Sequence, residues 1–197
     1  MTASIARLKI TLDDVAPKVL RRVEVPVLLR LDRLHLVIQA AMGWTDSHLY
    51  EIRARDVGWG EPDPDERYDG PLEARKAKLL DLIEDMGLKS FRYLYDFGDG
   101  WEHTVKIERL GDPAPEAVYP MLLHAEGRCP PEDSGGPWGY AELLKAVADP
   151  EHERHAELSE WIGEDFDPNA IDVEALTLSV EHLAKQWSRK PAVRRKA

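Results

Sequence analysis

The segment from Phe91 to Ile107 constrains the fold most, because apolar and polar side chains alternate on both sides of a turn sequence. The apolar positions are Phe91, Tyr93, Tyr95 and Phe97 before Gly98-Asp99-Gly100, and Trp101, His103, Val105 and Ile107 after it. A period of two is typical of a strand with one buried face, and glycines between two such runs indicate a hairpin. The segment therefore predicts two antiparallel strands whose aromatic face lies in the core.

The length of the turn decides which side chains face each other across this hairpin. A three-residue turn gives the pairs Phe97–Trp101, Tyr95–His103, Tyr93–Val105 and Phe91–Ile107. A two-residue turn would set the aromatic face against Glu102, Thr104 and Lys106, because a slip of one residue moves every side chain to the other face. We therefore predict the three-residue turn, which places Asp96 directly opposite Glu102.

The sequence also predicts strands in three earlier segments, at residues 5–12, 19–25 and 48–54. Together with strands at 91–97 and 101–109 they predict one mainly antiparallel sheet, since strands and helices do not alternate regularly along the chain. Apolar side chains at helical spacing predict a helix over 31–42 that packs on the apolar face of this sheet, with Gly43 as its C-terminal cap.

Helical patterns dominate the last third of the chain. They predict a helix from Gly136 to about Ala148, a second over 151–162 and a third that Asp172 caps, while 72–86 is an ambiguous short helix. The predicted fold class is α+β, with a mainly antiparallel sheet, a packed helix in the N-terminal half and a helical C-terminal third. We expect residues 1–189 to form a single domain and the basic tail at 190–197 to be disordered and dispensable for folding.

Composition narrows the cellular context and the classes of partner. The chain has 197 residues and a net charge of −11, which disfavours broad nucleic-acid binding because phosphate contacts need a positive surface. No apolar run approaches the roughly 20 residues that a membrane-spanning helix needs, and the first residues do not resemble a signal peptide. A single cysteine, Cys129, excludes an internal disulfide and suits a reducing compartment, so we expect a cytoplasmic protein.

Carboxylates gather at the tip of the predicted hairpin. In the chosen register Asp96 faces Glu102, which is destabilising for like charges, and Asp99 lies close by in the turn. These three residues are candidate metal ligands for Mg²⁺, Mn²⁺ or Ca²⁺, or a binding site for a basic group of a protein partner or ligand. The alternative is a solvated face that Arg92 or Lys106 partly neutralises.

The segment from Gly127 to Tyr140 holds two more candidate binding residues, Glu132 and Asp133. The two prolines before them fix an extended path, so the loop presents both carboxylates on a stiff support. Their position before a helix N-terminus equally explains them, because the helix dipole favours negative charge there. His103 is a further candidate for binding, although a histidine among aromatic residues is more often part of the core.

Catalytic motifs are incomplete in this sequence. Ser134 lacks the G-x-S-x-G context of a hydrolase, Cys129 has no partner histidine that the sequence places, and no H-E-x-x-H or paired-cysteine motif is present. Spacing also leaves open whether His35, His48 and His103 converge.

Several motifs resemble the plasmid pRiA4b ORF-3-like family. They are Leu34-His35, Met42-Gly43-Trp44, His48-Leu49-Tyr50, Y-L-Y-D-F-G-D-G-W-E-H at 93–103, P-P-E-D-S-G-G-P-W-G-Y at 130–140 and W-I-G-E-D-F-D-P-N-A-I-D at 161–172. The resemblance covers roughly residues 5–185 and implies a protein associated with plasmids or mobile elements, without an established activity. Ser134 stands where the family often has a second cysteine, which argues against a cysteine-based site here.

Two classes of function remain open. One is a non-catalytic binding or interaction module with an acidic site; the other is a metal-assisted hydrolase that uses the carboxylates of the 96–102 hairpin and the 130–136 loop. The resolvase label that some family members carry is disfavoured, because the chain is acidic and shows neither a catalytic-serine module nor a helix-turn-helix. We favour the module, and an enzyme would require these carboxylates to meet in one cleft.

Overall fold

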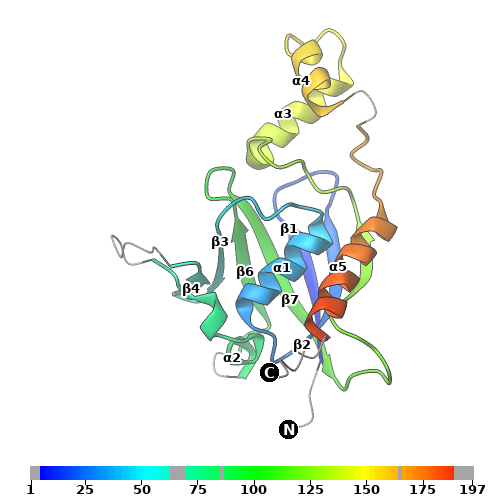
Figure 1. Ribbon diagram of the computed structural model, residues 1–197. Helices are drawn as coiled ribbons and strands as arrows, with labels where there is room; N and C mark the ends of the chain where they lie inside the picture. The colour runs from blue at the N-terminus through cyan, green and yellow to red at the C-terminus, as the bar shows by residue number, and fades with distance from the viewer. Residues whose placement is uncertain (1–4, 63–69, 85–86, 164–165, 189–197) are drawn as a thin grey trace, which may run out of the picture.

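The computed structural model describes residues 5–62, 70–84, 87–163 and 166–188. Within these ranges eight strands form one sheet in the order β5-β4-β3-β6-β7-β1-β2-β8 (Figure 1). The strands are β1 (Ile5–Leu12), β2 (Leu20–Pro26), β3 (Tyr50–Ala54), β4 (Val57–Gly60), β5 (Leu72–Glu73), β6 (Ser90–Tyr95), β7 (Trp101–Gly111) and β8 (Met121–Glu126). Each pair of neighbours is antiparallel except β4 and β5, so the predicted α+β fold with a mainly antiparallel sheet is confirmed.

All five predicted strands are present, with ends that differ by a few residues. β1 matches its prediction at both ends, because its alternation is the most regular: Ala6, Leu8, Ile10 and Leu12 are buried in the core. The sequence did not predict β4, β5 or β8. β5 has only two residues and β8 is partly exposed at the edge of the sheet, so neither carries a clear period-two pattern.

Helix α1 (Leu31–Met42) also matches its prediction and lies across one face of the sheet, beside α5 (Val173–Ser188) (Figure 1). Gly43 ends α1 in a left-handed conformation with φ of 89°, and its N–H donates to the Gln39 carbonyl oxygen. Asp172 caps α5 as predicted, since its Oδ1 accepts from the Ala175 N–H at 2.9 Å. None of the helices in the described ranges is long and apolar enough to cross a membrane.

Three further α-helices occur in the described residues. α3 (Gly136–Ala148) has its predicted bounds, and α4 (His155–Ile162) begins later than predicted; the two lie together beyond one end of the sheet (Figure 1). Of the ambiguous 72–86 segment, only α2 (Leu79–Glu84) is α-helical; it follows β5 and a 3-10 turn, η1 (Ala74–Lys76). The predicted disordered tail at 190–197 lies outside the described residues.

The predicted register of the β6–β7 hairpin is wrong by two residues. Tyr95 pairs with Trp101 and Tyr93 with His103, so residues 96–100 form the connection. β6 ends early because Asp96 adopts a left-handed conformation with φ of 55° and its N–H donates to the Leu49 carbonyl oxygen at 2.9 Å. A shift of two preserves the faces, which is why the aromatic residues of both strands are buried as expected.

This register separates the two carboxylates that were expected to face each other. Leu94, not Asp96, lies opposite Glu102. Phe97 leaves the aromatic face and is 49% exposed in the connection. The like-charge pair that motivated a cation between Asp96 and Glu102 therefore does not form, and these two residues do not share a metal ion as ligands.

Candidate functional site

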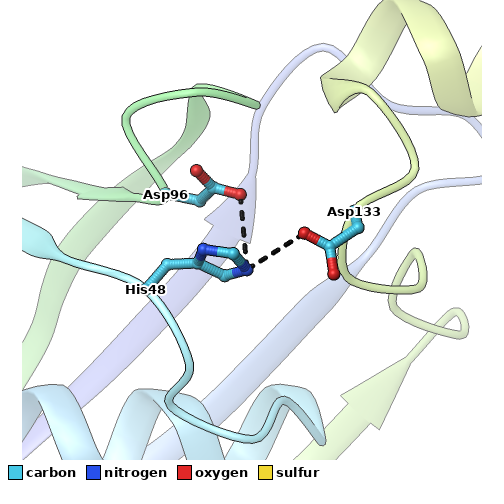
Figure 2. A group of neighbouring side chains, drawn as sticks. All are labelled: His48, Asp96 and Asp133. Atoms are coloured by element: carbon cyan, nitrogen blue, oxygen red, sulfur yellow. Dashed lines mark ion pairs between the residues drawn. The ribbon is translucent and has the colours of Figure 1, made fainter.

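His48, Asp96 and Asp133 converge where the segment before β3, the β6–β7 connection and the loop before α3 meet (Figure 2). The Nε2 atom of His48 lies 3.2 Å from Oδ1 of Asp133 and 3.7 Å from Oδ2 of Asp96. Each residue offers one potential ligand atom, and these three atoms all lie within 4.8 Å of one another. Within the described residues this is the group whose geometry fits a metal ion.

Asp96 is fixed by its own loop. Its Oδ1 accepts from the N–H groups of Gly98 at 2.9 Å and Asp99 at 3.3 Å, while its carbonyl oxygen accepts from the Gly100 N–H at 2.7 Å. These bonds occupy one carboxylate oxygen and leave Oδ2 facing His48 (Figure 2). Asp96 is therefore a buried carboxylate that is already oriented for a ligand, and it is the one member of the predicted metal trio that joins this group.

His48 is positioned from the side of β3. Its N–H lies 3.3 Å from the Tyr95 hydroxyl, and its ring meets the Tyr95 ring edge to face at 5.8 Å between centroids. Nε2 is buried, yet it has no hydrogen-bond partner among the described residues, although two carboxylate oxygens lie 3.2 and 3.7 Å away. A buried nitrogen that faces two carboxylates without bonding to either is an unusual feature of this site.

Asp133 reaches the group because the loop that carries it is docked on the hairpin. Glu132 accepts from the Tyr95 hydroxyl at 2.5 Å and from the Thr45 N–H at 3.1 Å, and also from the Thr45 hydroxyl. Burial and the neighbouring Glu132 carboxylate raise the pKa of Tyr95, so its hydroxyl stays protonated and can donate. Glu132 thus anchors the loop. Both of its carboxylate oxygens accept hydrogen bonds from Tyr95 and Thr45, so Glu132 is not assigned as a metal ligand.

A second anchor comes from Asp99, whose Oδ2 accepts from the Gly135 N–H at 3.0 Å. The next residue, Gly136, has φ of 69°, and a Cβ there would lie 2.1 Å from the Asp99 carbonyl oxygen. Only glycine allows this close approach between the loop and the hairpin. Asp99 and Glu132, both predicted as binding residues, therefore hold Asp133 in place.

Two other predicted site residues lie outside the group. Glu102 is 45% exposed in its side chain and lies 3.9 Å from Arg53. His103 is fully buried, and its Nδ1 donates to the carbonyl oxygens of Trp101 at 3.0 Å and Tyr93 at 3.2 Å. Since two acceptors require a proton on Nδ1, His103 is the Nδ1–H tautomer, and burial lowers its pKa to about 4.

The three histidines do not share a ligand position. Nδ1 of His35 lies 2.8 Å from the Tyr93 hydroxyl, its Nε2 lies 2.5 Å from Oδ1 of Asp46, and its ring stacks on Tyr50 at 3.6 Å. Burial lowers the pKa of His35, against the opposing effect of Asp46. Tyr93 contacts both His35 and His103, with centroid distances of 5.9 and 5.1 Å. Of these three histidines only His48 lies at Asp96 and Asp133, and the sequence did not indicate this role.

The loop from 127 to 136 borders two separate hollows. Glu132 lines a cavity of about 960 Å³ between the end of α1, the loop and the start of α5. Asp133 lines a groove of about 590 Å³ between α3 and α4, which also includes the exposed Trp138 and Trp161. Asp96 and Asp133 therefore meet beside His48, while Glu132 borders another hollow and Glu102 lies near Arg53, so the five predicted carboxylates do not line one cleft.

Comparison with other proteins places the chain in a family. The family described as "Plasmid pRiA4b ORF-3-like protein" matches residues 4–175. "Uncharacterized protein y4hQ" of Sinorhizobium fredii (strain NBRC 101917 / NGR234) is 60% identical over 191 residues, which cover 96% of this chain and 97% of that protein. The crystal structure of MM3350 from Methanosarcina mazei Go1, a protein of unknown function, is 33% identical with a TM-score of 0.79, covering 88% of this chain and 98% of that one. The resemblance seen in the motifs is confirmed, and the chain belongs to the plasmid pRiA4b ORF-3-like family.

Proposed function

We propose that this chain is a binding module that holds a divalent transition-metal ion between His48, Asp96 and Asp133. One observation carries the proposal: the buried Nε2 of His48 has no hydrogen-bond partner among the described residues, while carboxylate oxygens lie 3.2 and 3.7 Å away. A metal ion would bond to all three atoms at once. It would also offset the charge of two carboxylates that share one position.

The ligand set favours some ions over others. Imidazole nitrogen suits zinc, iron, nickel and copper, and manganese accepts mixed nitrogen and oxygen ligands, whereas magnesium and calcium prefer oxygen alone. Of the three ions expected from the sequence, manganese fits best, and zinc becomes a candidate. Bonds of about 2.0–2.2 Å place neighbouring ligand atoms roughly 3.0–3.5 Å apart, so only small movements of the side chains are needed.

The site is open on the side of Asp133, whose side chain is 73% exposed. Three protein ligands leave further coordination positions for water or for a donor atom of a partner. This openness supports a role in binding, in which the metal links the module to a protein or small-molecule partner. Metal-assisted hydrolysis is the second candidate, favoured by the groove between α3 and α4 that Asp133 borders.

We also infer a cytoplasmic location, because the single Cys129 excludes an internal disulfide and suits a reducing compartment. The net charge of −11 supports a protein or small-molecule partner over nucleic acid.

Calorimetric titration of metal-stripped protein with Mn²⁺, Zn²⁺, Mg²⁺ and Ca²⁺ tests the proposal. Manganese or zinc should bind, and at 100 times its dissociation constant the ion should stabilise the fold by about 2.7 kcal/mol. His48→Gln and Asp133→Asn should each remove most of the affinity. Glu102→Gln, which removes an exposed carboxylate outside the site, is the matched control and should bind normally.

The proposal is wrong if none of the four ions binds at millimolar concentration, or if His48→Gln binds as tightly as the parent protein. The metal-loaded protein should also be tested against p-nitrophenyl acetate and bis-p-nitrophenyl phosphate. Hydrolysis that disappears in His48→Gln would select the hydrolase over the binding module.

A further inference from the structure

Arg21 is a buried cation on the apolar face of β2. It is fully buried in the same row as Val23 and Val25, where an aliphatic side chain is expected. Nε donates to the Ala41 carbonyl oxygen at 2.7 Å, and Nη1 donates to those of Leu20 at 2.8 Å and Glu126 at 2.9 Å. Three carbonyl oxygens thus hold the guanidinium in one orientation.

The third nitrogen of this guanidinium is unsatisfied. Nη2 is buried and has no hydrogen-bond partner, and Arg21 forms no ion pair with a carboxylate within the described part of the chain. Burial lowers the pKa of Arg21, as expected for a cation removed from water without a counterion. Buried charges in proteins are normally paired, so an anion is the missing element.

Arg21 lines the cavity of about 960 Å³ next to the metal-binding loop, and Cys129 lies on the same wall. Much of the remaining wall is apolar and is formed by Met42, Trp44, Ile162, Ile171, Val173 and Leu176. Cavities of this size with an apolar lining and few polar groups are typical of small-molecule sites. A ligand here would combine an apolar body with one negative group.

The other charged residues of the cavity limit the charge of that ligand. Glu132 and Asp172 also line it, and their carboxylates would repel a polyanion. Arg128 is engaged elsewhere, because its guanidinium lies over the Phe166 ring at 4.6 Å from the centroid. Nη2 of Arg21 is the buried donor of this wall that lacks a partner among the described residues, and a single nitrogen suits one carboxylate oxygen better than a phosphate with three.

We propose that this cavity binds a small organic monocarboxylate, with a carboxylate oxygen on Nη2 of Arg21 and an aliphatic or aromatic body against the apolar wall. Because Nη2 is buried, binding requires a wall side chain to move and admit the oxygen. This site is separate from the metal site, since none of His48, Asp96 and Asp133 lines the cavity.

Calorimetric titration with octanoate tests the proposal, with EDTA present to exclude metal effects. Octanamide has the same body without the charge, and inorganic phosphate has charge without the body. Octanoate should bind about tenfold or more tightly than octanamide, as a charge-assisted hydrogen bond implies, and phosphate should show no binding. Equal binding of octanoate and octanamide, or tighter binding of phosphate, would overturn the proposal.

Substitutions in the wall of the cavity test whether octanoate binds there. Arg21→Gln should abolish the preference for octanoate over octanamide. If circular dichroism shows that this variant is unfolded, Ser179→Trp serves instead, because it fills the cavity from the exposed side of α5 and should weaken both ligands. Leu178→Trp changes a neighbouring exposed residue that does not line the cavity, and it should bind octanoate like the parent protein. Unchanged octanoate binding in Ser179→Trp would show that the ligand binds elsewhere.

Discussion

His103 should make the stability of this protein depend strongly on pH. In the folded state its Nδ1–H is bonded to two carbonyl oxygens, while Nε2 is buried without a partner among the described residues. A second proton would place a charge in this site, and burial therefore lowers the pKa to about 4. In the unfolded chain the pKa returns to about 6.5.

The difference between these two pKa values sets the size and the pH range of the effect. Between pH 6.5 and pH 4 His103 is protonated in the unfolded state and neutral in the folded state, so the free energy of unfolding falls as the pH falls. The loss is complete near pH 4, because below it both states bind the proton. Between pH 7 and pH 4 it amounts to about 3 kcal/mol for this one residue.

Urea denaturation of the parent protein and of His103→Asn, measured from pH 7 to pH 4, isolates this contribution. Asparagine keeps a donor near the two carbonyl oxygens but does not titrate, so other groups such as His35 contribute equally in both proteins. The free energy of unfolding of the parent should fall by about 3 kcal/mol more than that of the variant. Parallel pH profiles, or a native His103 that titrates near 6.5 by NMR, would contradict this pH dependence.

Two further predictions concern the loop that carries Asp133. In Gly136→Ala the added Cβ would displace the loop from the Asp99 carbonyl oxygen. The variant should therefore lower the free energy of unfolding by more than the roughly 1–2 kcal/mol expected for a left-handed residue alone. It should also weaken manganese binding. Gly87→Ala is the matched control for urea denaturation, since its φ is 61° and nothing lies within 4 Å of the added Cβ; equal losses in both variants would contradict the close approach. Burial raises the pKa of the Cys129 thiol, so iodoacetamide should react with it much more slowly in the native protein at pH 8 than in urea, and equal rates would contradict this.

Local patterns of residues predicted the helices and strands, whereas long-range contacts set the register of the hairpin. The bounds of β1, α1 and α3 followed from the sequence, because alternation, helical spacing and the residues at helix ends are properties of adjacent residues. The faces of the β6–β7 hairpin followed in the same way. Its register did not, because the left-handed Asp96 is bonded to Leu49, the residue just before the neighbouring strand β3.

The candidate site shows the same division. The sequence placed Asp96 and Asp133 among the five carboxylates of one acidic site, but it assigned the metal to Asp96, Asp99 and Glu102 and left His48 out. Glu132 and Asp99 proved to be anchors, because their partners Tyr95, Thr45 and Gly135 come from distant parts of the chain.

Periodicity and motifs were sufficient to predict the α+β class, the family and the aromatic core. Only the tertiary structure brought His48 to the two carboxylates and placed the guanidinium of Arg21 beside a cavity. His48 and Asp133 are 85 positions apart in the sequence. The loop that carries Asp133 is held on the hairpin because the Tyr95 hydroxyl donates to Glu132 and Asp99 accepts from the Gly135 N–H. Such contacts depend on how separate elements pack, and no local pattern of residues encodes them.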